Sequence, residues 1–219
     1  MKENKLVLLL IPVLLIAGIW VYYSTRVPDV PQDADSCYSQ SLALIQANKN
    51  DEAKKQVEGC IGKFPQDGRF DFQLGNIARK QNQMGQALAY YEAALKKSPQ
   101  LPEVYNNIAA VKMLENKLDE ALSVINEGLK QNPDYKDLKF KKGQILYVKQ
   151  DYAQVIPLLE SIANDPEYVE AYRFMGLAQF KQNQKEAAQA SLTAYLQKAP
   201  QSSQGVPEAQ KVLNQIQGK

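Results

Sequence analysis

Residues 87–99 read ALAYYEAALKKSP, and they carry the clearest sign of how the chain folds. Ala87, Tyr91 and Ala94 recur at helical spacing, so they share one face of a predicted helix. Small residues on both sides of an aromatic ring allow a second helix to approach closely. Pro99 ends the helix because proline has no backbone N–H to continue it. The stretch therefore predicts one half of a packed helical hairpin, with its two lysines facing water.

The same pattern returns along the chain every 33 or 34 residues. Each copy starts at a small residue and ends at or near a proline, and the five copies start at Ser41, Gly75, Ala109, Gly143 and Gly176. Polar turns such as QNQMG (81–85) and ENKLD (115–119) separate the two helices of a copy. A period of this length predicts helical hairpins stacked in a row, which is an α-solenoid.

This pattern resembles that of the tetratricopeptide repeat family, and residues 87–99 are similar to the second helix of such a repeat. The resemblance implies an all-α domain of about five helical hairpins over residues 35–200. Its units are expected at about residues 34–67, 68–101, 102–135, 136–168 and 169–201, followed by a capping helix at 206–217. The fourth unit is one residue short, so the helix register over 136–168 stays open.

The N-terminal part of the chain predicts a membrane anchor. Residues 6–23 form a run of eighteen residues without a charge, which is near the lower limit for a helix that crosses a bilayer. Basic residues dominate the short segment 1–5, so the positive-inside rule places it in the cytoplasm. We expect Trp20, Tyr22 and Tyr23 at the outer membrane interface. A proline-containing linker at 24–34 then leads to the repeats.

A cleaved signal peptide is the alternative to an anchor, because it has the same charged start and apolar run. Ala17 and Gly18 are small enough for a peptidase, but no A-x-A pattern follows them. A lipoprotein is disfavoured because Cys37 lies well beyond the apolar run. We therefore expect a single-pass protein of a bacterial inner membrane, with its repeat domain in the periplasm.

The only two cysteines, Cys37 and Cys60, lie 23 residues apart in the first unit. The family template implies that both point into the seam between the two helices of this unit. An oxidising compartment would favour a disulfide between them. Two buried free thiols are the alternative.

The composition argues against several classes of function. The 26 basic residues nearly balance the 24 acidic ones, which argues against a nucleic-acid-binding protein. Histidine is absent, so the commonest general base and metal ligand is missing. Two cysteines alone cannot hold a structural zinc ion. We expect no catalytic residues, no metal site and no cofactor, and hence no enzyme.

The family template implies a concave groove lined by the first helices of the units. The residues expected on it are Phe72, Asn76, Arg79, Asn106, Ala110, Met113, Phe140, Gln144, Tyr147, Arg173, Leu177 and Phe180. This mixture of aromatic, amide and arginine side chains suits an extended or helical peptide.

Some members of the family clamp a C-terminal carboxylate with lysines, asparagines and an arginine. Asn76 and Asn107 match that spacing here, and Lys141 stands at the arginine position. Phe72 and Asp137 occupy the two lysine positions, so most of the required positive charge is missing. The clamp is therefore disfavoured, and the asparagines are interpreted as structural.

The resemblance implies a protein that binds other proteins. We expect a membrane-anchored scaffold that assembles or stabilises a cell-envelope complex by holding a partner segment in the groove. Its partners would be subunits of a membrane or envelope complex, with the lipid bilayer contacted through residues 6–23 and no nucleic acid bound. The alternative is a periplasmic chaperone for translocated clients, of the cytochrome c maturation or translocon accessory type.

Overall fold

The computed structural model describes residues 30–218. The secondary structure of this part of the chain consists of helices joined by short turns, without a β-strand. The helices are α2 (Ala34–Gln46), α3 (Asn50–Lys63), α4 (Gly68–Lys80), α5 (Met84–Lys97), α6 (Pro102–Leu114), α7 (Leu118–Gln131), α8 (Lys136–Val148), α9 (Tyr152–Glu160), η1 (Pro166–Tyr168), α10 (Glu170–Lys181), α11 (Lys185–Lys198) and α12 (Val206–Ile216).

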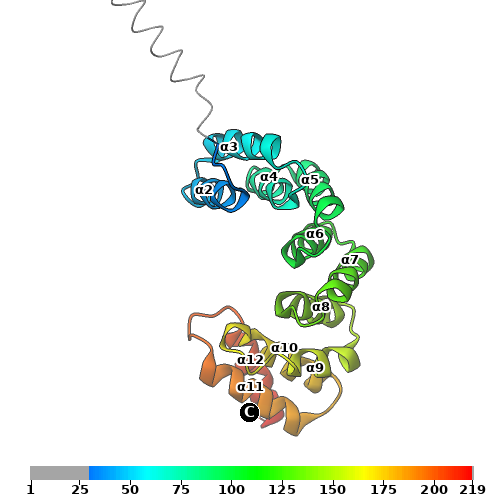
Figure 1. The fold of residues 1–219 in the computed structure, drawn as a ribbon. Helices are drawn as coiled ribbons and strands as arrows, with labels where there is room; N and C mark the ends of the chain where they lie inside the picture. The colour runs from blue at the N-terminus through cyan, green and yellow to red at the C-terminus, as the bar shows by residue number, and fades with distance from the viewer. Residues whose placement is uncertain (1–29, 219) are drawn as a thin grey trace, which may run out of the picture.

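Consecutive helices pack as pairs, and the pairs stack into an arc (Figure 1). Helices α2, α4, α6, α8 and α10 lie on the inner side of the arc, and their partners α3, α5, α7, α9 and α11 lie on the outer side. Each helix contacts mainly its neighbours in the sequence, as expected of a repeat array. The prediction of an all-α solenoid is confirmed.

The predicted membrane anchor at 6–23, with Trp20, Tyr22 and Tyr23, lies outside the described residues. Between residues 30 and 218, none of the helices combines the length and the apolar character that crossing a bilayer requires.

Small residues in the seams allow the helices of each pair to approach closely. Ala87, Tyr91 and Ala94 are all fully buried on α5, as their spacing predicts. Gly75 on α4 faces the ring of Tyr91, and a Cβ atom there would come within 2.4 Å of that ring. Gly143 on α8 meets Leu159 on α9 in the same way. The repeating small residues are therefore the contact points of the fold.

The turn inside each pair uses one residue with a left-handed backbone. These residues are Asn48, Asn82, Asn116, Gln150 and Asn183, with φ between 57° and 63°. Asparagine tolerates this conformation better than most residues, which explains its recurrence. Only the fourth turn, among the five, uses glutamine.

The fourth pair is irregular in its second helix. Helix α9 has nine residues, whereas α5, α7 and α11 each have fourteen. Pro157 lies inside α9, and the chain leaves the helix after Glu160 to form a turn and then η1. Ile162 and Ala163 in this turn remain buried, so the turn still fills the core. This is how the one-residue shortening is accommodated.

Cys37 and Cys60 form a disulfide that joins α2 to α3, with their Cα atoms 6.0 Å apart. Both residues are fully buried, so the bond lies within the seam of the first pair. The predicted pairing is confirmed, and the alternative of two free thiols is wrong.

Helix α12 closes the other end of the array. Ala209 and Leu213 are buried in one apolar cluster with Leu177, Leu192 and Tyr195. Gln210 and Lys211 on the other side of α12 are exposed. The amphipathic pattern thus shields the last pair from water, as the sequence predicts for a capping helix.

Candidate functional site

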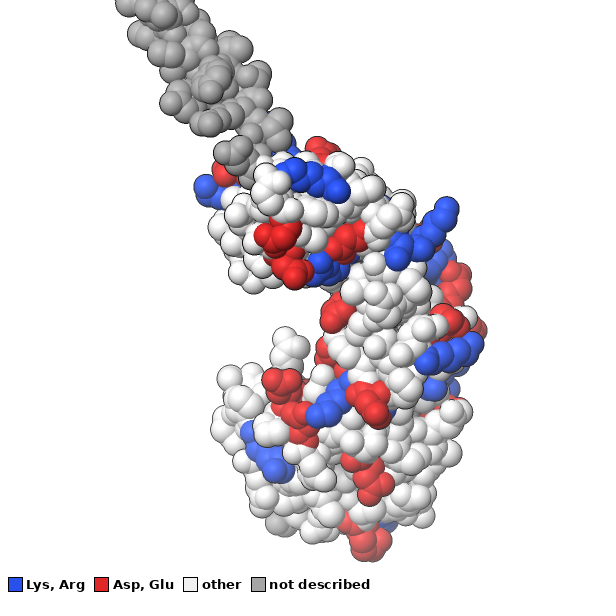
Figure 2. Space-filling view, in the orientation of Figure 1, with Lys and Arg blue, Asp and Glu red and all other residues white. Residues whose placement is uncertain are grey.

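The inner row of helices leaves one side of the arc open, and Figure 2 shows the resulting hollow between the first and last helix pairs. The twelve residues expected on the groove lie on α4, α6, α8 and α10, three on each helix. Arg79 is exposed, and the others, apart from Leu177, are half-buried. Ten of these twelve side chains are therefore set partly between helices rather than extended into solvent.

Leu177 does not line the groove, although the sequence predicts that it does. Its side chain is only 3% exposed, within the cluster that α12 covers. The template places this position on an open surface, but the capping helix packs where a further repeat would begin. Leu177 therefore belongs to the core.

Helices α8 and α10 carry a cluster of aromatic rings that includes the predicted groove residues Phe140 and Tyr147. The ring of Phe140 lies 5.9 Å from those of Tyr168 and Phe174, and the ring of Tyr147 lies 5.5 Å from those of Phe174 and Tyr152. All four contacts have edge-to-face geometry, which is favourable for aromatic pairs. We call these five rings the aromatic platform; they pack against one another across two helix pairs.

Asn76 and Asn107 belong to a polar seam rather than to a carboxylate clamp. The Asn76 Oδ1 atom accepts hydrogen bonds of 2.8 Å from the Tyr91 hydroxyl and from the Asn107 amide. The Phe72 ring packs 5.9 Å from the Tyr91 ring. Burial lowers the pKa of Lys141, the residue at the clamp's arginine position. The amides therefore tie α4, α5 and α6 together, as the structural interpretation predicts.

Two arginines near the ends of the groove are each held by two carboxylates and a ring. Arg69 pairs with Asp67 at 2.6 Å and Asp35 at 2.7 Å, and its guanidinium lies 5.3 Å from the Tyr38 ring centre. The arrangement links α2 to α4 and leaves the guanidinium fully paired with carboxylates.

Arg173 repeats this arrangement at the other end. It pairs with Glu170 at 2.7 Å and Glu208 at 2.6 Å, and its guanidinium lies 4.4 Å from the Phe174 ring centre. It therefore links α10 to the capping helix, and it offers no free charge to a carboxylate ligand.

Acidic side chains gather along the edge of the hollow (Figure 2). Burial raises the pKa of Tyr38, and the nearby charge of Glu103 raises it further. Burial also raises the pKa of Tyr135, to which the charges of Glu103 and Asp137 add. The Tyr168 hydroxyl donates a 2.7 Å hydrogen bond to Asp137 Oδ1. Tyr135 and Tyr168 thus lie close to carboxylates near the start of α8.

Several of these residues were not anticipated from the sequence. Phe174 and Tyr168 complete the aromatic platform, but Tyr168 lies in the irregular segment where the repeat register breaks. Glu103 and Asp137 did leave a signal, because they stand 34 and 68 residues after Arg69 and so share its position in the repeat.

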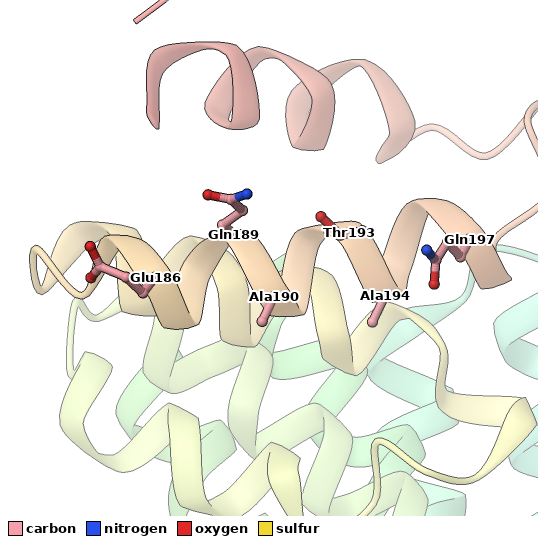
Figure 3. A pocket seen from close by; sticks show the side chains of 6 residues that line it. All are labelled: Glu186, Gln189, Ala190, Thr193, Ala194 and Gln197. Atoms are coloured by element: carbon pink, nitrogen blue, oxygen red, sulfur yellow. The ribbon is translucent and has the colours of Figure 1, made fainter. Parts of the chain in front are cut away.

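A second depression of about 460 Å³ lies on the outer helix α11. Its lining residues are Glu186, Gln189, Ala190, Thr193, Ala194 and Gln197. Figure 3 shows Ala190 and Ala194 on one side of the helix and Gln189 and Thr193 on another, without convergence on a common point. A single carboxylate beside amides and alanines offers no catalytic arrangement, so the groove remains the candidate site.

Comparisons with known proteins agree with this architecture. Family models described as tetratricopeptide repeat match residues 38–102, 78–141 and 175–202. No curated protein matches the chain.

Solved structures of similar fold include pilF of Pseudomonas aeruginosa, with a TM-score of 0.68 and 16% identity, covering 84% of this chain and 88% of that one. A tetratricopeptide repeat protein of Parabacteroides merdae has a TM-score of 0.68 and 18% identity, with coverages of 86% and 75%. YrrB, described as a TPR protein with an unusual peptide-binding site, has a TM-score of 0.64 and 16% identity, with coverages of 82% and 92%. At such low identity these likenesses show the fold alone. With its repeating pattern, its stacked helix pairs and the three family matches, the chain belongs to the tetratricopeptide repeat family.

Proposed function

We propose that this protein is a membrane-anchored scaffold that holds a segment of a partner protein in its concave groove. The observation that carries the proposal is the part of the aromatic platform formed by Phe140, Tyr147 and Phe174, which lie half-buried on the inner helices α8 and α10. Rigid aromatic side chains on a preformed surface are typical anchors for a peptide, because they bury a large area at little entropic cost. The described peptide-binding site of YrrB, which has a similar fold, supports this mode of action.

The proposed location is the periplasmic face of a bacterial inner membrane, where the protein would assemble or stabilise an envelope complex. The uncharged run at 6–23 supports an anchor. The Cys37–Cys60 disulfide supports an oxidising compartment, because cytosolic thiols are usually kept reduced. Anchoring would confine the search for a partner to the membrane surface and raise the effective concentration of both proteins.

Site-specific photo-crosslinking in intact cells tests the groove. A photoreactive amino acid replaces Arg79 or Gln144 in the groove, and Thr193 on the outer helix α11 serves as the matched control. We expect a discrete crosslinked partner from the groove positions and none from Thr193. Equal crosslinking from Thr193, or none from the groove, contradicts the proposal. A broad set of partners instead of one indicates the chaperone alternative.

The location is tested separately by a reporter fused after the C-terminus that is active only outside the cytoplasm. Activity of the fusion supports the periplasmic placement, and an inactive fusion at normal protein levels overturns it. This measurement does not depend on whether the groove binds a partner.

A further inference from the structure

One position of the repeat forms a column of charged residues along the row of inner helices. Its members are Asp35, Arg69, Glu103, Asp137 and Glu170. Each lies at or near the start of an inner helix, from α2 to α10, so equivalent residues follow one another along the arc. Four of the five side chains are carboxylates.

At both ends of this column, the carboxylates form ion pairs with an arginine of the chain itself. Arg69 lies between Asp35 and Asp67 against the ring of Tyr38. Arg173 lies between Glu170 and Glu208 against the ring of Phe174. The same arrangement therefore occurs twice. In each case a guanidinium lies over an aromatic ring and pairs with two carboxylates.

In the middle of the column, at Glu103 and Asp137, carboxylates and aromatic rings are present, but no arginine pairs with them. Neither Glu103 nor Asp137 forms an ion pair with any residue between 30 and 218. Tyr168 donates its hydroxyl hydrogen to Asp137, and the Phe140 ring lies 5.9 Å from the Tyr168 ring. Glu103 and Asp137 lie at equivalent positions of the adjacent inner helices α6 and α8, and both raise the pKa of Tyr135, after the larger effect of burial.

The lysines of this region do not replace the arginine. Lys136 pairs with Asp165 at 2.5 Å and Lys139 pairs with Asp134 at 3.1 Å. Lys141 is half-buried and makes no ion pair within residues 30–218, although the charge of Asp137 acts on it. Glu103 and Asp137 are exposed and form no ion pair within residues 30–218, so they remain open to a cation from outside.

From this geometry we infer that the partner segment places an arginine or lysine side chain in the middle of the groove, between Glu103 and Asp137 and against the rings of Phe140 and Tyr168. The inference rests on the proposed function, because it names the chemistry of the segment that the groove would hold. Carboxylates beside aromatic rings attract a cation through both charge and the ring quadrupole. The same surface would repel a C-terminal carboxylate.

Binding of a defined probe to the full-length protein in detergent tests the inference. The probe is a fluorescein-labelled short peptide of alternating arginine and alanine, and its matched control carries citrulline in place of arginine. Citrulline keeps the planar shape but has no charge. The variants are Glu103→Gln and Asp137→Asn, and Glu92→Gln on the outer helix α5 is the control, since Glu92 is exposed and forms no ion pair with the described residues. Fluorescence anisotropy reports the affinity.

We expect the arginine peptide to bind more tightly than the citrulline peptide, and its affinity to fall by roughly fivefold in each groove variant. Added salt should reduce the difference between the two peptides. Glu92→Gln should bind like the unmodified protein. Equal binding of both peptides, absence of binding, or an equal loss in Glu92→Gln overturns the inference. If groove crosslinking still captures a partner in that case, the proposed function stands and only the cationic chemistry fails.

Discussion

Gly75 lies against the ring of Tyr91 so closely that a Cβ atom at Gly75 would stand 2.4 Å from the Tyr91 Cε1 atom. Real Cβ atoms do not approach a neighbour at this distance, so a side chain here must displace the ring. Tyr91 cannot move easily, because it is fully buried and its hydroxyl is bonded to Asn76. The glycine is therefore required by close helix approach, and not by backbone conformation.

Replacing Gly75 by alanine should destabilise the fold by about 1–3 kcal/mol, the usual cost of overpacking a core. Gly85→Ala is the matched control, because a Cβ at Gly85 in α5 meets nothing within 4 Å. We expect that control to stabilise the protein by about 0.5–1 kcal/mol through helix propensity. Urea unfolding measures both free energies, and a change of the same sign in both variants would contradict the packing argument.

The fourth turn offers a stabilising substitution. Gln150 has φ of 63°, whereas the four equivalent residues of the other turns are asparagines. Gln150→Asn should raise the free energy of unfolding by roughly 0.5 kcal/mol, because asparagine accepts the left-handed region more readily. Asn116→Gln is the converse change and should lower it by a similar amount. Thermal denaturation of both variants checks the prediction, which fails if Gln150→Asn lowers the melting temperature.

Reduction of the Cys37–Cys60 disulfide should lower the free energy of unfolding by about 3 kcal/mol, as expected for the loop that it closes. The measurement is denaturant unfolding with and without a strong reductant. A double variant, Cys37→Ala with Cys60→Ala, should not respond to the reductant. Hydrogen exchange should place the loss mainly in α2 and α3, and unchanged stability of the reduced protein would refute the prediction.

Alkaline pH should destabilise the protein through Tyr195. Burial, together with the hydrogen bond that its hydroxyl donates to Glu170, raises the pKa of Tyr195 from 10.0 to about 12. Above pH 10 the unfolded chain loses this proton while the folded state keeps it, so stability falls as the pH rises through this window to about 12. Tyr195→Phe should show a smaller loss between these two pH values. A variant that loses as much stability as the unmodified protein would exclude Tyr195 as a cause.

The repeat architecture could be predicted because its determinants recur. Gly75, Ala87 and Tyr91 make the same contacts that their equivalents make in other units, so spacing alone reveals which side chains meet. The disulfide could be predicted because Cys37 and Cys60 occupy seam positions in one pair.

What could not be predicted are the contacts that occur only once. Leu177 is buried because α12, which does not belong to the repeat, covers it. Tyr168 reaches Asp137 and Phe140 because α9 ends early and η1 follows. The central carboxylates were visible in the sequence as a column, but their lack of an ion pair depends on where Lys136 and Lys139 find other partners.

The disulfide also determines how a pulling force would travel through the molecule. A force applied to the chain before α2 reaches Cys37 and passes through the covalent bond directly to Cys60. The residues between the two cysteines then carry no tension, so α2 cannot be peeled away from α3. The load instead enters the array at the end of α3, where it is shared by the packing of α3 against α4. If the protein is anchored through its N-terminal segment and holds a partner, as proposed, the disulfide protects the first helix pair from unravelling under load.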